Sequence, residues 1–216
     1  MRVVTTLRVE WLSSVGGLCM HAVMRSWLHN QCRSGGSEMT NEETCLRLIS
    51  VDDAAELAEL VQANREHLRP WEPTRDPSYY TEKTQYELIE IALNNSEAGV
   101  SVPFVIESDR GEILGRLTLS GITRGALQSC ALSYWVRVDR LRRGYATRAA
   151  SEAAHYAFEV LGLHRMQAET LPENVASQEV VKRVGFTVFG VAPKYLRING
   201  ECRDHVMFQL LNEAFE

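Results

Sequence analysis

From residue 45 onward, hydrophobic and polar residues recur at the spacings of short strands and amphipathic helices. The stretch 112–122 alternates a largely apolar set with a largely polar one, a period of two that predicts a half-buried antiparallel strand. Its apolar set is Ile113, Gly115, Leu117 and Leu119. After Gly144, small and apolar residues instead recur every three or four positions, which predicts a helix lying close to a sheet. That stripe consists of Ala146, Ala149, Ala150, Ala153, Ala154, Ala157, Phe158 and Leu161.

The same analysis along the chain gives one order of elements. Ser50 and Asp53 match an acidic form of the capping box at a helix start, and the helix must end before Pro70. The expected elements are a strand at 46–49, helices from 50 and at 81–94, strands at 102–107, 112–122 and 129–137, a helix at 146–161, a strand at 165–170, a helix at 174–183, and strands from 186 and at 204–211. This order, βααβββαβαββ, predicts an α/β (α+β) fold with an antiparallel meander at its centre.

The length of 216 residues suits one domain, but the first forty residues differ from the rest. They contain four Arg and two acidic residues, a net charge of +2, so the other 176 residues carry −7 of the total −5. We therefore expect a poorly ordered leader or extension at residues 1–40 and a folded domain at residues 41–216.

The leader contains a fairly apolar stretch, Trp11–Met24, which resembles the central region of a signal peptide. His21 interrupts it, however, and no A-x-A cleavage site follows. A bilayer span needs about twenty apolar residues, so no transmembrane helix is expected. The alternative to an unstructured leader is that Trp11, Trp27 and their Leu neighbours dock on the domain or on a second subunit.

Composition narrows the class of protein. With 45% hydrophobic and 24% charged residues, the chain is typical of a globular protein and unlike disordered or fibrous chains. The net charge of −5 and the pI of about 5.7 argue against a general nucleic-acid clamp. Five cysteines without a CxxC pair predict neither a disulfide framework nor a zinc site, and no metal is expected. A reducing cytoplasm is the expected location.

A basic glycine turn, Arg140-Leu-Arg-Arg-Gly-Tyr-Ala, joins an expected strand to the Ala-rich helix. Backbone N–H groups at such a helix start can converge on an anion, and Gly144 lets the backbone approach it closely. Arginine forks suit phosphate oxygens. The turn is not a Walker A loop, because Tyr145 stands where its Lys belongs, and alone it is as typical of a solvated helix start as of a diphosphate site. The candidate ligands are Leu141, Arg142, Arg143, Gly144, Tyr145, Ala146 and Thr147.

A second cluster, Pro172-Glu-Asn-Val-Ala-Ser, opens the next helix. Asn174 is a good N-cap, and Ser177 lies one turn further on, facing the cleft beside the preceding strand. Gly185 marks the C-cap of this helix. Such caps by themselves occur in many helices that have no catalytic role.

At this spacing and in this order, the two clusters resemble the GCN5-related N-acetyltransferase (GNAT) family. Its cofactor loop runs Q/R-x-x-G-x-G/A, and its next helix carries Asn-x-x-Ser/Ala before a Gly-Phe. The resemblance covers about Cys45–Leu211. The segments Leu68-Arg-Pro-Trp-Glu-Pro, Ser133-Tyr-Trp-Val and Tyr195-Leu-Arg-Ile-Asn-Gly-Glu-Cys-Arg-Asp-His are similar to the RimJ/RimL branch, the ribosomal-protein N-terminal acetyltransferases. The resemblance implies the GNAT fold, a mixed and mostly antiparallel sheet flanked by helices, with acetyl-CoA as cofactor.

The sequence departs from the family pattern at two positions. Leu141 replaces the opening Gln or Arg of the loop, so its contact with the cofactor would be through the backbone. The tyrosine that many members use to protonate the departing thiolate corresponds to Val181, which has no proton to donate. Ser177 resembles the serine used in the RimL branch and is the expected substitute, while Asn174 and Ser177 both border the cofactor.

The resemblance also implies the mechanism, a direct attack of an amine on the thioester. A backbone N–H between Val136 and Val138, on a strand splayed from its neighbour, would bind the carbonyl oxygen. Glu72 is the expected catalytic carboxylate, with Glu169 and Asp204 as alternatives. Trp71, Tyr195 and Asp204 are the expected substrate contacts.

The leading hypothesis is an acetyl-CoA-dependent transferase that acts on a protein N-terminal α-amine, with a ribosomal protein as the expected partner. The alternatives are a small amine acceptor, such as an antibiotic or a polyamine, and a non-catalytic acyl-CoA-binding module. Direct contact with nucleic acid or membrane is not expected, and a homodimer is left open.

Overall fold

A computed structural model describes residues 44–215, so the expected leader at residues 1–40 lies outside the described residues. The strands are β1 (Thr44–Leu48), β2 (Val102–Ser108), β3 (Ile113–Thr123), β4 (Ser129–Val136), β5 (Arg165–Thr170), β6 (Thr187–Ile198) and β7 (Glu201–Leu211). The α-helices are α2 (Ala54–Ala63), α3 (Arg65–Leu68), α4 (Glu82–Glu97), α5 (Tyr145–His155) and α6 (Val175–Val184). Short 3-10 turns are η1 (Val51–Asp53), η2 (Pro77–Tyr80) and η3 (Val138–Arg140), and η4 (Tyr156–Val160) is a π-helical turn.

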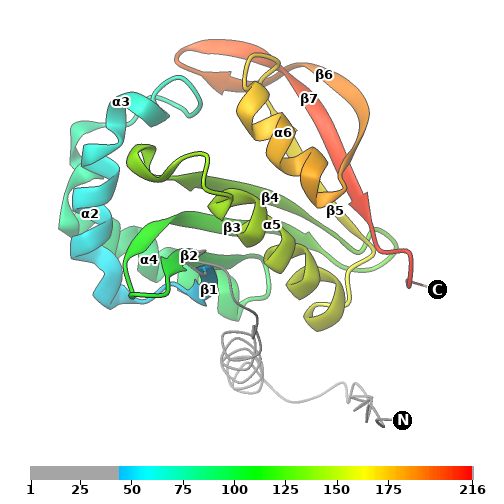
Figure 1. Ribbon diagram of the computed structural model, residues 1–216, viewed down its shortest axis with the longest axis horizontal. Coiled ribbons are helices and arrows are strands. Elements are labelled where there is room, and N and C mark those ends of the chain that lie inside the picture. Colours follow the sequence, from blue (N-terminus) through cyan, green and yellow to red (C-terminus); the bar gives the residue numbers. More distant parts are fainter. Residues whose placement is uncertain (1–43, 216) are drawn as a thin grey trace, which may run out of the picture. The chain divides into compact units, whose positions relative to one another are not determined.

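Within these residues the strands form one sheet in the order β1-β2-β3-β4-β5-β7-β6 (Figure 1). Every neighbouring pair is antiparallel except β4 and β5, which run parallel. A parallel pair needs a crossover connection, and α5 supplies it between β4 and β5. The mixed, mostly antiparallel sheet that the sequence predicts is therefore confirmed.

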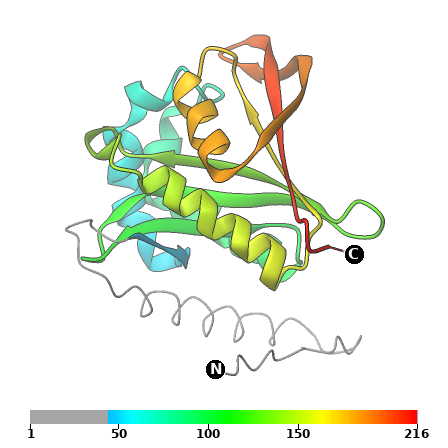
Figure 2. The ribbon, with the colours of Figure 1, turned by 45° about the vertical axis from the view of Figure 1, so that its right-hand side comes forward.

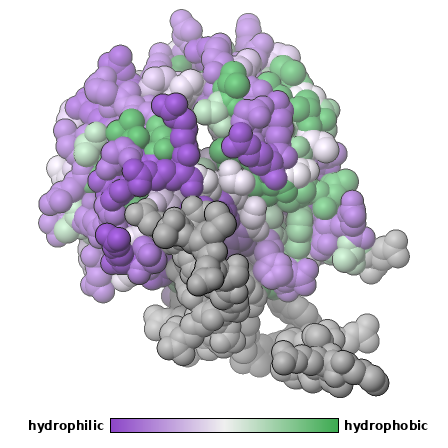
Figure 3. Space-filling view, viewed as in Figure 1, coloured by the Kyte–Doolittle hydropathy of each residue, from purple (hydrophilic) through white to green (hydrophobic). Residues whose placement is uncertain are grey.

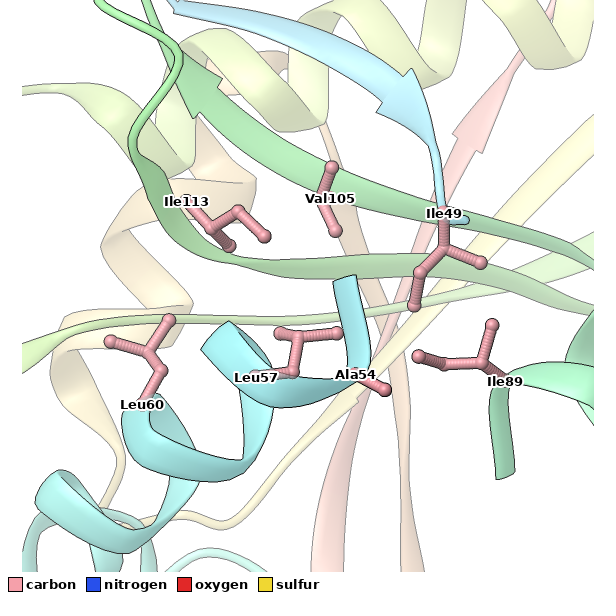
Figure 4. Packing of buried hydrophobic residues seen from close by; sticks show 7 residues of the cluster. All are labelled: Ile49, Ala54, Leu57, Leu60, Ile89, Val105 and Ile113. Atoms are coloured by element: carbon pink, nitrogen blue, oxygen red, sulfur yellow. The ribbon is translucent and has the colours of Figure 1, made fainter. Parts of the chain in front are cut away.

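Helices cover both faces of the β1–β4 half of the sheet. On one face, α2 and α4 pack against β2 and β3 around a cluster of seven buried residues (Figure 4). The cluster is Ile49, Ala54, Leu57, Leu60, Ile89, Val105 and Ile113. On the other face, Phe104 contacts the ring of Tyr156 at the end of α5, with ring centroids 5.4 Å apart. Phe104 and Val105 pack on opposite faces of the sheet, because successive residues of a strand point to opposite faces.

The alanine stripe predicted after Gly144 is the buried face of α5. Ala149, Ala150, Ala153 and Ala157 are buried, so the helix lies close along the sheet (Figure 2). The regular α-helix ends at His155 and the π-helical turn η4 completes the stripe.

Most predicted helix ends are confirmed by their caps. The side chains of Ser50 and Asp53 form the reciprocal capping box, although the first turn after them is the 3-10 turn η1. Thr81 caps α4, which extends three residues beyond the predicted end at position 94. Gly185, at φ 107°, ends α6 in the left-handed conformation as predicted.

The last hairpin is longer than predicted. Strand β7 begins at Glu201 rather than at position 204, because Asn199 and Gly200 both adopt positive φ and form a tight turn directly after β6. An Asn-Gly pair between two strand patterns is a strong hairpin signal, and it could have placed this boundary.

The sheet opens between β4 and β5. Residues Ser129–Ala131 of β4 pair with residues Arg165–Gln167 of β5, and beyond Ala131 the two strands are not paired. On its other edge β5 remains paired with β7 along its whole length. The helices that follow the two diverging strands, α5 and α6, both begin near the carboxyl end of the opening, which is a common place for a ligand site.

Candidate active site

A cavity of about 710 Å³ lies at this opening, within the size range of ligand pockets. In the space-filling view, the surface is hollowed between α3 and α6 (Figure 3). The cavity is lined by four segments: the α3 region, the end of β4, the turn into α5, and one face of α6. Its lining residues are His67, Leu68, Trp71, Tyr134, Trp135, Val136, Arg140, Leu141, Arg142, Gly144, Tyr145, Ala146, Thr147, Asn174, Ala176, Ser177, Glu179, Val180 and Arg183. Three of its charged residues are Arg and one is Glu, a balance that favours an anionic ligand.

The turn into α5 has the backbone geometry that suits an anion at a helix start. Arg142 and Gly144 adopt positive φ of 60° and 84°, which turns the chain sharply into the helix. Gly144 is the N-cap and provides no side-chain cap, and the N–H groups of the first turn have no carbonyl partner within the helix. Ala146 and Thr147, in that first turn, line the cavity. At φ 84°, Gly144 has a backbone conformation that residues with a Cβ rarely adopt, so a larger residue would strain this turn.

Not every arginine of the turn serves the cavity equally. Glu112 accepts hydrogen bonds from Arg137 at 2.6 Å and from Arg140 at 3.0 Å, so this carboxylate neutralises part of the charge on both. Arg142 is exposed and lines the cavity, whereas Arg143 does not line it. Of the three predicted arginines, Arg142 is therefore best placed to meet a phosphate group.

Asn64, at the C-terminal end of α2, fixes the start of this turn. Its Oδ1 accepts a hydrogen bond from the Val138 N–H at 2.7 Å, and its Nδ2 donates to the Leu60 carbonyl at 2.8 Å. The side chain is buried, so both bonds exclude water. The sequence prediction that Val138 offers its N–H to a ligand is therefore wrong, because Asn64 already accepts that hydrogen.

Val136 is left as the amide that faces the opening. The Arg137 N–H donates to the Leu114 carbonyl at 2.8 Å, and Val136 lies opposite Gly115 in the β3–β4 ladder. Hydrogen bonds of an antiparallel strand alternate in direction, so the Val136 N–H points away from β3. Strand β5 has diverged on that side, and Val136 lines the cavity.

The start of α6 lies across the cavity from this turn. Asn174 Oδ1 accepts a hydrogen bond from the Ser177 N–H at 3.1 Å, as expected of the N-cap. Ser177 Oγ lies 3.0 Å from the hydroxyl oxygen of Tyr134, which comes from β4. Tyr134 also donates to the Ser177 carbonyl at 3.3 Å.

The sequence analysis did not single out Tyr134, although it found Ser177 and noted the missing tyrosine at position 181. Val181 is fully buried, so that helix position faces the core. Burial raises the pKa of Tyr134 to about 12, and its hydrogen bond with Ser177 offsets part of that rise. The phenol therefore stays protonated over the physiological pH range. Tyr134 stood in the Ser133-Tyr-Trp-Val segment that resembles the RimJ/RimL branch, but neither that segment nor the alternation within β4 reveals a partner 43 residues away.

The residues predicted for the acceptor side are not all brought together. Trp71 lines the cavity, but Glu72, Tyr195 and Asp204 do not. The Glu72 carboxylate pairs with Arg75 at 3.5 Å, and Asp204 Oδ1 accepts the Lys194 N–H at 2.8 Å.

Tyr195 and Glu169 form a separate group near the last hairpin. Tyr195 packs on the ring of His205, with centroids 5.5 Å apart. Partial desolvation and the negative charge of Glu169 raise the pKa of Tyr195, and burial raises the pKa of Glu169. The raised pKa makes Glu169 a stronger proton acceptor than an ordinary glutamate and a candidate base.

The tip of the β6–β7 hairpin is tied to the loop after α3. The Asn199 side chain donates to the Arg69 carbonyl at 2.9 Å and contacts Thr74 Oγ1 at 3.2 Å. These two contacts join segments more than 120 residues apart and keep Trp71 beside the last hairpin.

Two other features of residues 44–215 bear on function. No helix among them is long and apolar enough to cross a membrane. No group of three or more His, Cys, Asp or Glu side chains among them is arranged to hold a metal ion.

A helix start suited to an anion, a strand amide that faces the opening and a part-buried hydroxyl pair lie around one cavity, an arrangement that suits an acyl-CoA-dependent transferase. Comparison with known proteins identifies the family: residues 43–187 match the acetyltransferase (GNAT) domain model. The chain belongs to the GNAT acetyltransferases, and it is an acetyl-CoA-dependent N-acetyltransferase close to the ribosomal-protein N-acetyltransferases.

Individual relatives support this assignment. The [ribosomal protein uS5]-alanine N-acetyltransferase of Escherichia coli (strain K12) is 32% identical over 173 residues, which cover 80% of this chain and 89% of that protein. Mycobacterium smegmatis RimJ in complex with CoA-disulfide has a TM-score of 0.77 at 34% identity, covering 79% of this chain and 82% of that one. The ribosomal-protein-S5-alanine acetyltransferase from Vibrio fischeri has a TM-score of 0.77 at 28% identity, covering 84% and 100%.

Proposed function

We propose that this enzyme transfers the acetyl group of acetyl-CoA to the N-terminal α-amine of a protein, with a ribosomal protein as the natural acceptor. The observation that carries the proposal is the cavity in which the α5 cradle, the Val136 amide and Ser177 converge. The acceptor class is supported by the Escherichia coli relative, whose name gives the alanine of ribosomal protein uS5 as its target.

The residues of the cavity divide into binding and reacting groups. The first-turn amides of α5, together with Arg142, bind the pyrophosphate of the acyl donor. Gly144 permits the close approach of the backbone. Asn174 holds the start of α6 in place, so that Ser177 lines the cavity that would hold the thioester. The donor supplies the activated acetyl group, and the cavity residues orient it.

The reaction exchanges one bond for another at the acetyl carbon. The amine nitrogen forms a bond to that carbon, the carbon–sulfur bond breaks, and its electron pair leaves with sulfur. The Val136 N–H stabilises the negative charge that develops on the carbonyl oxygen. Ser177 donates a hydrogen bond to the departing thiolate, and the amine proton passes to a base or to water.

The pKa of the acceptor decides how strong that base must be. An α-amine with a pKa near 7.8 is neutral in about one molecule in seven at pH 7. A lysine amine with a pKa near 10.4 is neutral in only about one molecule in 2,500. The difference corresponds to roughly 3.5 kcal/mol. Neither Glu72 nor Glu169 lines the cavity, so the base acts through water, which suffices for an α-amine. Because its pKa is raised, Glu169 replaces Glu72 as our preferred base.

A panel of acceptors tests the proposal. The full chain is incubated with acetyl-CoA and peptides that begin with Ala, Ser, Thr or Met, with blocked-N-terminus lysine peptides and polyamines as controls, and the products are identified by mass. We expect acetylation of free α-amines, with preference for small first residues. Exclusive acetylation of polyamines or of lysine side chains would instead identify a small-amine or lysine acetyltransferase.

The cytoplasmic location and a homodimer stay predictions.

Substituting Ser177 tests its role in the reaction. Ser177→Ala removes the hydroxyl but leaves the N-cap bond from the Ser177 N–H to Asn174 intact. We expect kcat to fall roughly 10- to 100-fold, with KM for acetyl-CoA changed less than about two-fold. Ala176→Ser, one residue earlier on the same cavity wall, is the matched control and should keep the wild-type rate. Unchanged turnover of Ser177→Ala would remove the assignment.

A further inference from the structure

The hydroxyls of Tyr134 and Ser177 form a pair whose two protons have more than one arrangement. Tyr134 has one proton and lies within reach of two oxygens of the same residue, Ser177 Oγ at 3.0 Å and the Ser177 carbonyl at 3.3 Å. The carbonyl can only accept, whereas either hydroxyl can donate to the other. The pair therefore has two hydrogen-bonding states. In one, the Ser177 hydroxyl donates to the Tyr134 oxygen; in the other, Tyr134 donates to Ser177 Oγ and the Ser177 O–H points elsewhere.

Only one of these states serves the reaction. If Ser177 donates to Tyr134, its single proton is used and none points at the leaving group. If Tyr134 donates to Ser177 Oγ, the serine proton is free to point into the cavity that both residues line. A thiolate that forms beside Ser177 favours the second state, because a hydrogen bond to an ion is stronger than one between neutral groups.

We propose that Tyr134 is a positioning residue, which donates to Ser177 Oγ so that Ser177 directs its own proton at the departing thiolate. The inference rests on the proposed role of Ser177 and adds the residue that orients it. Strand β4 thus supplies from across the cavity the phenol that position 181 lacks. The hydroxyl of Tyr134 acts through Ser177 and not on the sulfur itself.

The electrostatics of Tyr134 support positioning over proton donation. Its pKa is about 12, while that of a thiol is about 8.5, so moving the phenol proton to a thiolate is unfavourable by a factor of roughly 3,000. A group that holds its proton this firmly is a dependable hydrogen-bond donor. Its charge state does not change between pH 6 and pH 10, so it adds no step to the pH profile.

A double-mutant cycle tests the inference. Tyr134→Phe removes the hydroxyl and keeps the ring, and Ser177→Ala removes its partner. CoA thiol release is measured with a peptide acceptor and also with water alone, since thiolate departure is common to both reactions. We expect Tyr134→Phe to lower kcat about 3- to 10-fold with an unchanged KM for acetyl-CoA and an unchanged pH profile. In the Ser177→Ala background, the same change should have no further effect.

Controls separate positioning from a structural role. Tyr156→Phe removes the hydroxyl of another buried tyrosine, which lies outside the cavity lining, and should keep the wild-type kcat. Incorporation of 3-fluorotyrosine at position 134 keeps a hydroxyl and should retain the full rate.

Two results would overturn the inference. One is a wild-type kcat in Tyr134→Phe. The other is that Tyr134→Phe lowers kcat by the same factor in the Ser177→Ala background as in the wild type. If no peptide is acetylated while CoA thiol release in water alone is normal, the proposed acceptor is refuted. The double-mutant cycle can then still be measured from thiol release in water.

Discussion

Gly115 offers a direct test of how the fold places the reacting amide. A Cβ built at this position would lie 2.0 Å from the Trp135 carbonyl oxygen and 3.0 Å from the Val136 Cα. Both are backbone atoms, so no side-chain movement can relieve the contact. The strands β3 and β4 must separate, and the neighbouring hydrogen bond from Arg137 to Leu114 lies in the same stretch of ladder.

The size of the effect follows from comparison with a second strand glycine. Gly190 in β6 also has ordinary φ, and a Cβ there would meet nothing within 4 Å. Gly190→Ala should therefore stabilise the fold by about 0.4–1 kcal/mol, because alanine restricts the unfolded chain. Gly115→Ala has the same gain but also an overpacking cost of about 1–3 kcal/mol or more. Because the gain is common to both, the two variants should differ in free energy of unfolding by the overpacking cost, about 1–3 kcal/mol or more.

Urea unfolding of both variants measures this difference, and steady-state kinetics measure its consequence. We expect Gly115→Ala to lose at least ten-fold in kcat under conditions where it remains folded, because Val136 moves with β4. Gly190→Ala should keep the wild-type kcat. Equal stabilities for the two variants, or full activity in Gly115→Ala, would refute the argument that this close approach fixes the Val136 amide.

Three further changes have defined outcomes. Asn64→Ala leaves the Val138 N–H without its acceptor and should cost about 1–3 kcal/mol in urea unfolding; a smaller loss would show that water replaces the side chain. Arg142→Ala should raise the Kd for CoA roughly 10-fold at low salt by titration calorimetry, and an unchanged Kd would exclude a phosphate contact. Burial raises the pKa of Glu152 to about 7 from an unfolded value near 4.5, so the folded state binds more protons between these pH values and stability falls as pH rises through them. The free energy of unfolding of Glu152→Gln should therefore exceed that of the wild type by roughly 1–3 kcal/mol at pH 8 and equal it near pH 4. If the difference in free energy of unfolding is the same at both pH values, titration of Glu152 is excluded as its cause.

Local patterns in the sequence predicted local structure well. The capping box at Ser50, the N-cap at Asn174 and the C-cap at Gly185 depend on residues within a few positions of one another. The alanine stripe likewise predicted the buried face of α5. The Asn199-Gly200 turn was available by the same logic but was not used, which left the start of β7 three residues late.

The candidate site was predicted only as far as its local motifs reached. The turn from Leu141 to Thr147 and the Asn174–Ser177 pair line one cavity, apart from Arg143. The acceptor side rested on similarity of segments without a capping or turn motif, and only Trp71 among its predicted residues lines the cavity. Glu72 and Asp204 were reasonable by chemistry, but local partners in the loop and in the hairpin engage them.

By itself, the sequence determined the elements, their order and the two clusters of the family motif, because periodicity and capping act over a few residues. Only the tertiary structure decided which groups face each other. Tyr134 reaches Ser177 across 43 residues, and Asn64 binds the Val138 amide across 74. Such contacts follow from the divergence of β4 from β5 and from the packing of α2 beside the turn, and no local pattern encodes either. The hydrogen-bond partner of a buried hydroxyl or amide is set by the whole sheet, whose geometry only the folded chain defines.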